Sequence, residues 1–333
     1  MRDLHNPMDR RLFLKNLGLF SSLIATGCGS QVLHGHADPL GSAQPQARDS
    51  LAMQLFKSLN PGQREAICLP PSHATRDFIS NWWYVLPEHR ITNTFNDDQQ
   101  ELILDLFNSL HSEEHRRGVA QHMIKDQYND PDNAPSVAFY GTPDDEDFEF
   151  IFTGHHVTRR CLVHAPDGRG FGNRPVFYGT YVGDFNESKD HPGNPYWYQG
   201  RILNTFFREL DGKQQALALS AREPRSEDDT MVISRCVGDW PGLPCADLSR
   251  DHKELLLKSM EEMLALFRPA DVAATMATIR NNRLIDGLHL SCYQGRHDIG
   301  DDGVWDTWQI EGPNLVWYFR GQPHVHCYFH LAT

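Results

Sequence analysis

A histidine-rich segment, HVHCYFH, covers residues 324–330. In a β-strand, side chains two positions apart lie on one face, so His324 and His326 would point the same way, about 6.6 Å apart along the strand. Two imidazoles at this separation can bind one metal ion, because each metal–nitrogen bond is about 2.0 to 2.1 Å long. The spacing therefore predicts half of a metal site.

A further ligand must come from elsewhere in the chain, and the Gly-His-His segment at residues 154–156 is the best candidate. It follows residues 148–152, where phenylalanine occupies every second position, as in a strand with one apolar face. Strict alternation would direct His156 to the apolar side and His155 to the other, but a glycine often marks a bulge that reverses this order. Both histidines are retained, and the predicted metal ligands are His155, His156, His324 and His326.

Neutral imidazole binds zinc, copper and iron, and the predicted cofactor is a divalent transition metal, copper or zinc in preference to iron. An ion with an open coordination position would support hydrolysis with zinc, or oxygen and electron chemistry with copper, on a small-molecule substrate. Two alternatives stay open. In the first alternative the protein is a non-catalytic metal carrier. In the second it is a binding module whose histidines have only structural roles.

The first 28 residues have the features of a twin-arginine export signal. Arg10 and Arg11 precede Phe-Leu-Lys, and a mildly apolar stretch follows at residues 17–25. This stretch is too short and too rich in glycine and serine for a permanent membrane span. The twin-arginine export machinery is therefore a predicted partner, and the predicted location is the bacterial periplasm or cell envelope.

Processing of the signal has two alternatives. A lipid on Cys28 would anchor the mature chain to the membrane, whereas cleavage nearer Ala37 would release it. Residues 29–49 are rich in Gly, Ser, Gln, Pro and His without apolar periodicity, which predicts a disordered tether. The remaining residues, 50–333, form the predicted single folded domain.

The composition is that of a globular protein, with 40% hydrophobic and 23% charged residues among 333. The formal net charge is -13, which disfavours a polyphosphate partner. The chain is therefore not expected to bind nucleic acid, and the signal or the lipid on Cys28 would make the only membrane contact.

The order of the elements predicts an α+β fold with a central, mostly antiparallel sheet flanked by helical hairpins. Helical spacing begins near Ser50, and Asn60-Pro61 is expected to cap and open a second helix. Further helices are expected from Glu113 onward and over residues 251–281. The strand pattern begins at Ser136, and the strand-like segments are residues 148–153, 176–182, 202–207, 231–236, 306–310, 314–319 and 324–330.

Hairpin-turn residues at 320–323 are expected to join the last two strands. Pairing of Phe319 with His324 would place Trp317 opposite His326, and cross-strand partners share a face. The sequence therefore predicts aromatic walls around the histidines, as in a ligand pocket.

Several of these segments together resemble domain-of-unknown-function family 3500, and the resemblance spans nearly the whole mature chain. The Gly-His-His and His-x-His elements are its most specific parts. The resemblance implies an exported protein with a histidine-centred site and names no reaction. The segments that carry it are residues 55–59, Gln63-Arg64, Asn81-Trp82, 139–143, 152–156, 310–313 and 324–326.

Overall fold

The computed structural model describes residues 50–127, 133–164, 174–180, 196–220, 227, 240–294, 305–321 and 324–332. Contacts within the chain define a compact unit over Ser50–Thr333. The predicted signal (1–28) and tether (29–49) lie outside the described residues, as does the predicted strand at 231–236.

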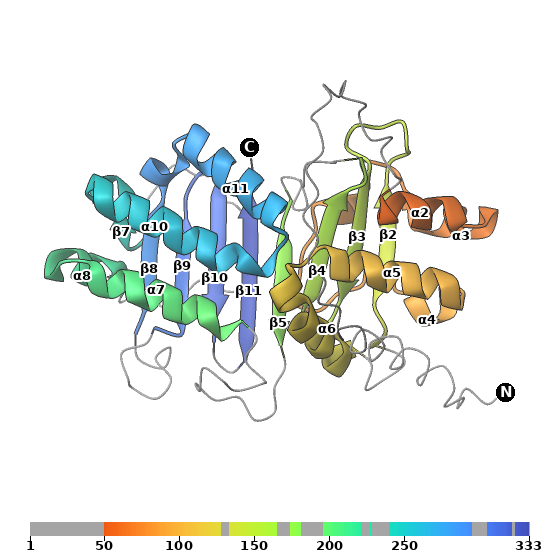
Figure 1. The fold of residues 1–333 in the computed structure, drawn as a ribbon, viewed down its shortest axis with the longest axis horizontal. Helices are drawn as coiled ribbons and strands as arrows, with labels where there is room; N and C mark the ends of the chain where they lie inside the picture. The colour runs from red at the N-terminus through yellow and green to blue at the C-terminus, as the bar shows by residue number, and fades with distance from the viewer. Residues whose placement is uncertain are drawn as a thin grey trace, which may run out of the picture. The chain divides into compact units, whose positions relative to one another are not determined.

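One sheet of 11 strands forms the centre of the described part of the chain (Figure 1). Its order is β1-β2-β3-β4-β5-β11-β10-β9-β8-β6, and β7 pairs with β8 beside this path. All pairs are antiparallel except β1 with β2 and β6 with β8, which confirms a mostly antiparallel α+β fold. The strands are β1 Cys68–Leu69, β2 Ser136–Tyr140, β3 Glu149–Gly154, β4 Val157–Leu162, β5 Val176–Thr180, β6 Leu219–Ser220, β7 Leu243–Pro244, β8 His289–Tyr293, β9 Thr307–Glu311, β10 Leu315–Arg320 and β11 Val325–Leu331.

Helices precede and follow the first run of strands. Asn60 caps α3 through a reciprocal hydrogen-bond pair with Gln63, with Pro61 at the first helical position, as expected from the sequence. The arrangement of the helices as flanking hairpins stays a prediction. The helices are α2 Leu51–Ser58, α3 Pro61–Ile67, α4 Ile91–Thr94, α5 Asp97–Ser109, α6 Glu113–Gln127, α7 Trp197–Glu209, α8 Gly212–Ala218, α10 Arg250–Met263 and α11 Pro269–Asn281.

The larger helices pack against one face of the sheet (Figure 1). In the N-terminal half, Phe107 of α5 contacts Phe152 of β3, with ring centroids 4.7 Å apart. In the C-terminal half, the amide nitrogen of Gln199 in α7 donates to the Tyr178 hydroxyl of β5 at 3.0 Å. Helices therefore pack against this face in both halves of the sheet.

The opposite face of β2, β3 and β5 is covered by the segment that follows β1. Trp83 and Val85 pack against Ile151 in one buried cluster. Ile79 packs against a second cluster that includes Phe177 and Tyr328. The sheet is therefore buried on both faces at these strands, which explains why its sequence is apolar with little alternation.

One predicted strand is wrong, because residues 202–207 lie inside α7. The aromatic and β-branched residues there favour a strand by propensity. However, the buried residues Leu203, Phe206 and Phe207 are spaced three and four positions apart, which is the period of one helix face. Packing of this face against the sheet overrides the local preference.

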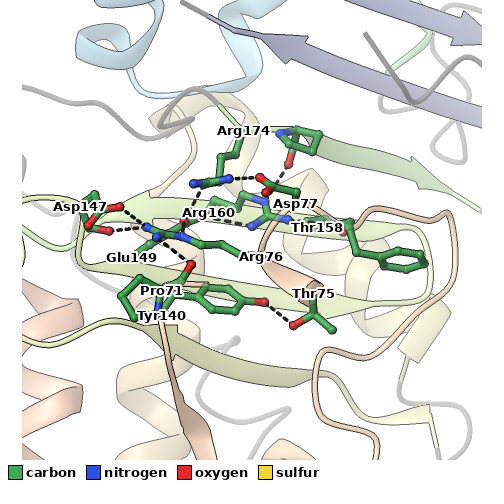
Figure 2. A network of polar contacts seen from close by, with 12 residues as sticks. Pro71, Thr75, Arg76, Asp77, Tyr140, Asp147, Glu149, Thr158, Arg160 and Arg174 are labelled. Carbon is green, nitrogen blue, oxygen red and sulfur yellow. Dashed lines mark hydrogen bonds and ion pairs between the residues drawn. The ribbon is translucent and has the colours of Figure 1, made fainter. Parts of the chain in front are cut away.

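A buried ionic network lies on the face opposite the helices, around Glu149 of β3. Figure 2 shows the guanidinium groups of Arg76, Arg160 and Arg174 gathered around this carboxylate. Arg76 Nε donates to Glu149 Oε2 at 3.1 Å, and Arg160 Nη1 donates to Glu149 Oε1 at 3.0 Å. Arg174 lies 3.2 Å from the same carboxylate and also pairs with Asp77. Glu149 thus interacts with arginines from three separate segments of the chain.

None of the helices in the described part of the chain is both long and apolar enough to cross a bilayer.

Candidate metal centre

The hairpin between β3 and β4 turns through His155 and His156. Gly154 pairs with Val157, so these two histidines form the connection and are not part of a continuing strand. His156 has a φ of 56°, in the left-handed region that non-glycine residues seldom adopt. Its N–H donates to Asn81 O at 2.8 Å, and its carbonyl accepts from Gly179 N at 3.1 Å. Backbone contacts on two sides therefore fix the direction of the His156 side chain.

The other two histidines lie at the start of β11. His326 pairs with Gly179 of β5 and with Arg320 of β10, and His324 directly precedes the strand. The predicted hairpin register is wrong, because Phe319 pairs with Cys327 and not with His324. The observed register is shifted by three residues from the predicted one, and this odd shift moves the aromatic partners to the other face.

Three imidazole nitrogens converge between these elements. The distances between Nε2 atoms are 3.1 Å from His324 to His156, 2.8 Å from His324 to His326 and 3.0 Å from His326 to His156. Among the described residues, this trio is the one group of histidine, cysteine or acidic side chains with metal-site spacing. We refer to His156, His324 and His326 as the three-histidine cluster.

These distances match the geometry of a bound ion. For metal–nitrogen bonds of about 2.0 to 2.1 Å, they correspond to nitrogen–metal–nitrogen angles of roughly 85–100°. Three ligands at such angles occupy one side of an ion and leave the opposite side for water or substrate. The cluster is thus compatible with a site that has three protein ligands and an open position.

His155, the fourth predicted ligand, is not in the cluster. Its ring stacks on that of His156, with centroids 3.9 Å apart and planes inclined by 27°. On its other side lies Trp82, whose ring centroid is 4.7 Å away and whose side chain is exposed. The structure therefore brings together three of the four predicted histidines and places His155 as a packing neighbour.

Two carboxylates lie within hydrogen-bond distance of the Nδ1 atoms of two of the cluster histidines, His156 and His326. Asp126 Oδ2 lies 2.9 Å from His156 Nδ1, and the Asp126 side chain is only 3% exposed. Glu227 Oε1 lies 2.9 Å from His326 Nδ1. An ionised carboxylate can only accept, so each Nδ1 carries the hydrogen and each Nε2 presents a lone pair toward the cluster. Carboxylate–histidine pairs of this kind orient metal-bound imidazoles in proteins.

Both carboxylates are themselves held in place. Asn81 Nδ2 donates to Glu227 Oε2 at 3.1 Å, and Arg320 Nη1 lies 2.7 Å from Glu227 Oε1. Asp126 lies on α6 one helical turn after His122, whose Nδ1 is 2.8 Å from the Thr180 hydroxyl. The outer groups therefore connect the cluster to α6, β5 and β10.

A glycine sets the spacing between the two halves of the site. A side chain on Gly179 would place its Cβ 2.3 Å from the backbone carbonyl of Val325. No rotamer change relieves a clash with backbone, so β5 can approach the start of β11 this closely only with glycine. This close approach brings the turn at His156 within reach of His326.

The imidazoles of the cluster are held in the neutral, metal-binding form. Burial is the main cause, and it lowers the pKa of His156 to about 2 and that of His324 to about 4. Burial also lowers the pKa of His326 to about 4, although its hydrogen bond with Glu227 acts in the opposite direction. Burial tends to raise the pKa of Glu227, but this hydrogen bond and the nearby charges lower it overall.

These pKa values predict that the metal-free protein loses stability in mild acid. At pH values between the folded-state pKa values and the unfolded-state pKa of about 6.5, these histidines bind more protons in the unfolded chain than in the folded protein. The free energy of unfolding therefore falls as the pH falls. At pH 5 we expect a loss of about 1 to 2 kcal/mol for each of His156 and His326, measured by urea unfolding. A His326→Asn variant should show a flatter profile, and an unchanged stability from pH 7 to pH 5 would contradict the prediction.

The carboxylates should influence metal affinity without touching the ion. Asp126→Asn or Glu227→Gln is expected to weaken zinc binding by about 10–100-fold, because the Nδ1–H loses its charged acceptor. Competition titration with a chelator measures this change. Glu114→Gln, at an exposed position on the same helix as Asp126, is the control and should bind zinc like the wild type.

Sequence reasoning missed Asp126, Glu227, Asn81 and Arg320. Asp126 follows a long polar stretch of α6, and no local pattern separates it from its neighbours. Arg320 was assigned to the turn and is in fact the β10 partner of His326. Only the three-dimensional arrangement identifies these residues as partners of the cluster.

The fold and the site together define an α+β protein with three convergent imidazoles backed by two carboxylates. A family model described as protein of unknown function, DUF3500, matches residues 42–333. The chain belongs to this family, as the sequence resemblance indicated. No curated protein and no solved structure matches the chain.

Proposed function

We propose that the protein is an exported metalloenzyme that binds zinc or copper through His156, His324 and His326. The observation that carries the proposal is the contact between His156 and His326. Their Nε2 atoms lie 3.0 Å apart, while both Nδ1 atoms face carboxylates. Two lone pairs in such proximity repel each other, and a cation between them converts this repulsion into coordination.

Among the described residues the cluster has three ligands and no fourth, which supports catalysis in preference to storage. Structural zinc sites are closed by four protein ligands, whereas catalytic sites have three and keep a position for water. Zinc in this position would lower the pKa of a bound water and favour hydrolysis, and copper would favour oxygen or electron chemistry. The chain's own contribution is to orient the imidazoles through Asp126 and Glu227. The twin-arginine signal, which delivers folded proteins to the periplasm, fits insertion of the ion before export.

Elemental analysis tests the proposal. Wild-type protein purified after twin-arginine export should contain about one zinc or copper ion per chain, as expected for one site. The His324→Ala, His326→Ala double variant should contain almost none, while its circular dichroism spectrum shows that it is folded. Equal metal contents in the two proteins would exclude the site.

A second measurement separates an enzyme from a carrier. Cobalt substituted into the site should change its visible spectrum when azide is added, because azide takes the open position. A spectrum that does not respond to azide would indicate a closed site and favour the carrier.

A further inference from the structure

The face of β8–β11 turned away from α7 and α10 carries a set of polar side chains in register. Residues paired across strands share a face, and so do residues two apart within a strand. By this register, polar groups line up across the strands in two adjacent rows, one of which starts at the three-histidine cluster. We call them the polar rows: His326, Arg320 and Thr307 in the first, and Tyr328, Tyr318, Gln309 and Ser291 in the second.

Several groups of the polar rows are buried without a hydrogen-bond partner. The side chains of Thr307 and Gln309 are 0% exposed, and Ser291 is 1% exposed. Within the described part of the chain, no partner is found for Ser291 Oγ, Thr307 Oγ1, Gln309 Nε2 or Arg320 Nε. Such groups are unfavourable in an interior, so a bound partner that completes their hydrogen bonds would be stabilised there.

A second buried glutamine, on the helix-covered side of the sheet, gives the contrast. Gln199 is also 0% exposed, but its amide nitrogen donates to the Tyr178 hydroxyl and to the Met263 carbonyl, both at 3.0 Å. The Gln309 carbonyl accepts a single bond, from the Tyr293 hydroxyl at 3.4 Å, and its amide hydrogens point to no acceptor. The amide of Gln199 is therefore satisfied, whereas the amide nitrogen of Gln309 is buried without an acceptor in the described part of the chain.

The polar groups without a partner indicate which kind of ligand could bind to them. Gln309 and Arg320 offer N–H donors, and Ser291 and Thr307 offer hydroxyls that both donate and accept. Arg320 is neutralised by Glu227 at 2.7 Å, and the second polar row holds no charge. A molecule rich in uncharged oxygen atoms matches this set, and an anion does not.

The dimensions and position of the polar rows limit the size of the ligand and place one end of it at the three-histidine cluster. Strands are about 4.8 Å apart, so the second row extends over about 14 Å, and the rows lie about 6.6 Å from each other. At one end of the second row, Tyr328 and Tyr318 pack with Phe177 and Val316 in a buried cluster that Ile79 covers, so the open polar groups lie toward Gln309 and Ser291. We infer that the polar rows bind a neutral, hydroxyl-rich molecule, such as a short oligosaccharide, with one end at the three-histidine cluster. The inference rests on the proposed function only in placing an ion at that end.

Ligand binding tests the inference directly. Maltotriose, cellotriose and xylotriose serve as neutral probes and trigalacturonate as the anionic counterpart, each with the zinc-loaded and the zinc-free protein. Saturation-transfer NMR and the shift in unfolding temperature are the measurements. At least one neutral probe should bind, and trigalacturonate should not.

Matched variants locate the binding. Gln309→Leu and Ser291→Ala should weaken binding of the neutral probe by about two- to tenfold each, the effect of one hydrogen bond. Neither variant should lower the unfolding temperature of the ligand-free protein, because neither removes a well-paired group. Gln199→Leu should lower the unfolding temperature and retain probe binding.

The possible results separate this inference from the proposed function. If zinc binds but no neutral probe does up to its solubility limit, the polar rows hold only water and the inference is overturned. Preferential binding of trigalacturonate, or unchanged probe binding by Gln309→Leu and Ser291→Ala, also overturns it. If a neutral probe binds to a protein that takes up no zinc, the proposed function fails while the assignment of the polar rows stands.

Discussion

Replacing His156 by asparagine is expected to lower zinc affinity by more than about 100-fold, beyond the effect of losing an outer carboxylate. Asparagine tolerates the left-handed backbone at this position, where φ is 56°, so the turn should keep its shape. The shorter amide cannot reach the other two imidazoles. Isothermal titration with zinc, or chelator competition for tight binding, measures the change.

The neighbouring histidine provides the control. His155→Asn alters the same hairpin turn and removes a ring that stacks on His156, lies near Trp82 and hydrogen-bonds the backbone of Asp126, but it removes no nitrogen of the cluster. Its zinc affinity should stay within a few-fold of the wild type. Equal losses in the two variants would mean that the turn, and not the His156 nitrogen, determines binding.

Glu149→Gln is expected to destabilise the fold by about 3–5 kcal/mol, as measured by urea unfolding. The substitution keeps the size of the side chain but leaves the buried guanidinium groups of Arg76 and Arg160 without their shared negative charge. Removing one partner of a buried ion pair is costly because the remaining charge stays desolvated.

Asp147→Asn is the matched control within the same network. Asp147 lies 2.9 Å from Arg76, but its side chain is 60% exposed, so water can replace the interaction. Its loss should reduce the free energy of unfolding by less than about 1 kcal/mol. Similar effects of the two substitutions would show that burial does not set the strength of this network.

The sequence predicted those parts of the site that depend on local geometry. His324 and His326 were expected to lie close together because residues two apart share a strand face. His326 lies in β11, His324 directly precedes it, and their Nε2 atoms are 2.8 Å apart. The pairing register was wrong by three residues, because Phe319 pairs with Cys327 and not with His324. Sequence patterns give strand faces well, whereas loop length determines which residues meet across a hairpin.

The remaining parts of the site depend on contacts between distant segments. Asp126 and His156 are separated by 30 residues, and Glu227 and His326 by 99. No local periodicity encodes such pairs. The α7 helix was missed for a related reason, since its strand-like residues are helical only because they pack against the sheet.

The close approach at Gly179 predicts which residues should change together among members of the family. Because a Cβ there would meet the Val325 carbonyl at 2.3 Å, any larger residue must push β11 away from the hairpin that bears His156. Members of the family that acquired a side chain at this position should have been released from selection on the histidines, and substitutions at the two places should appear together on the same branches of the family tree.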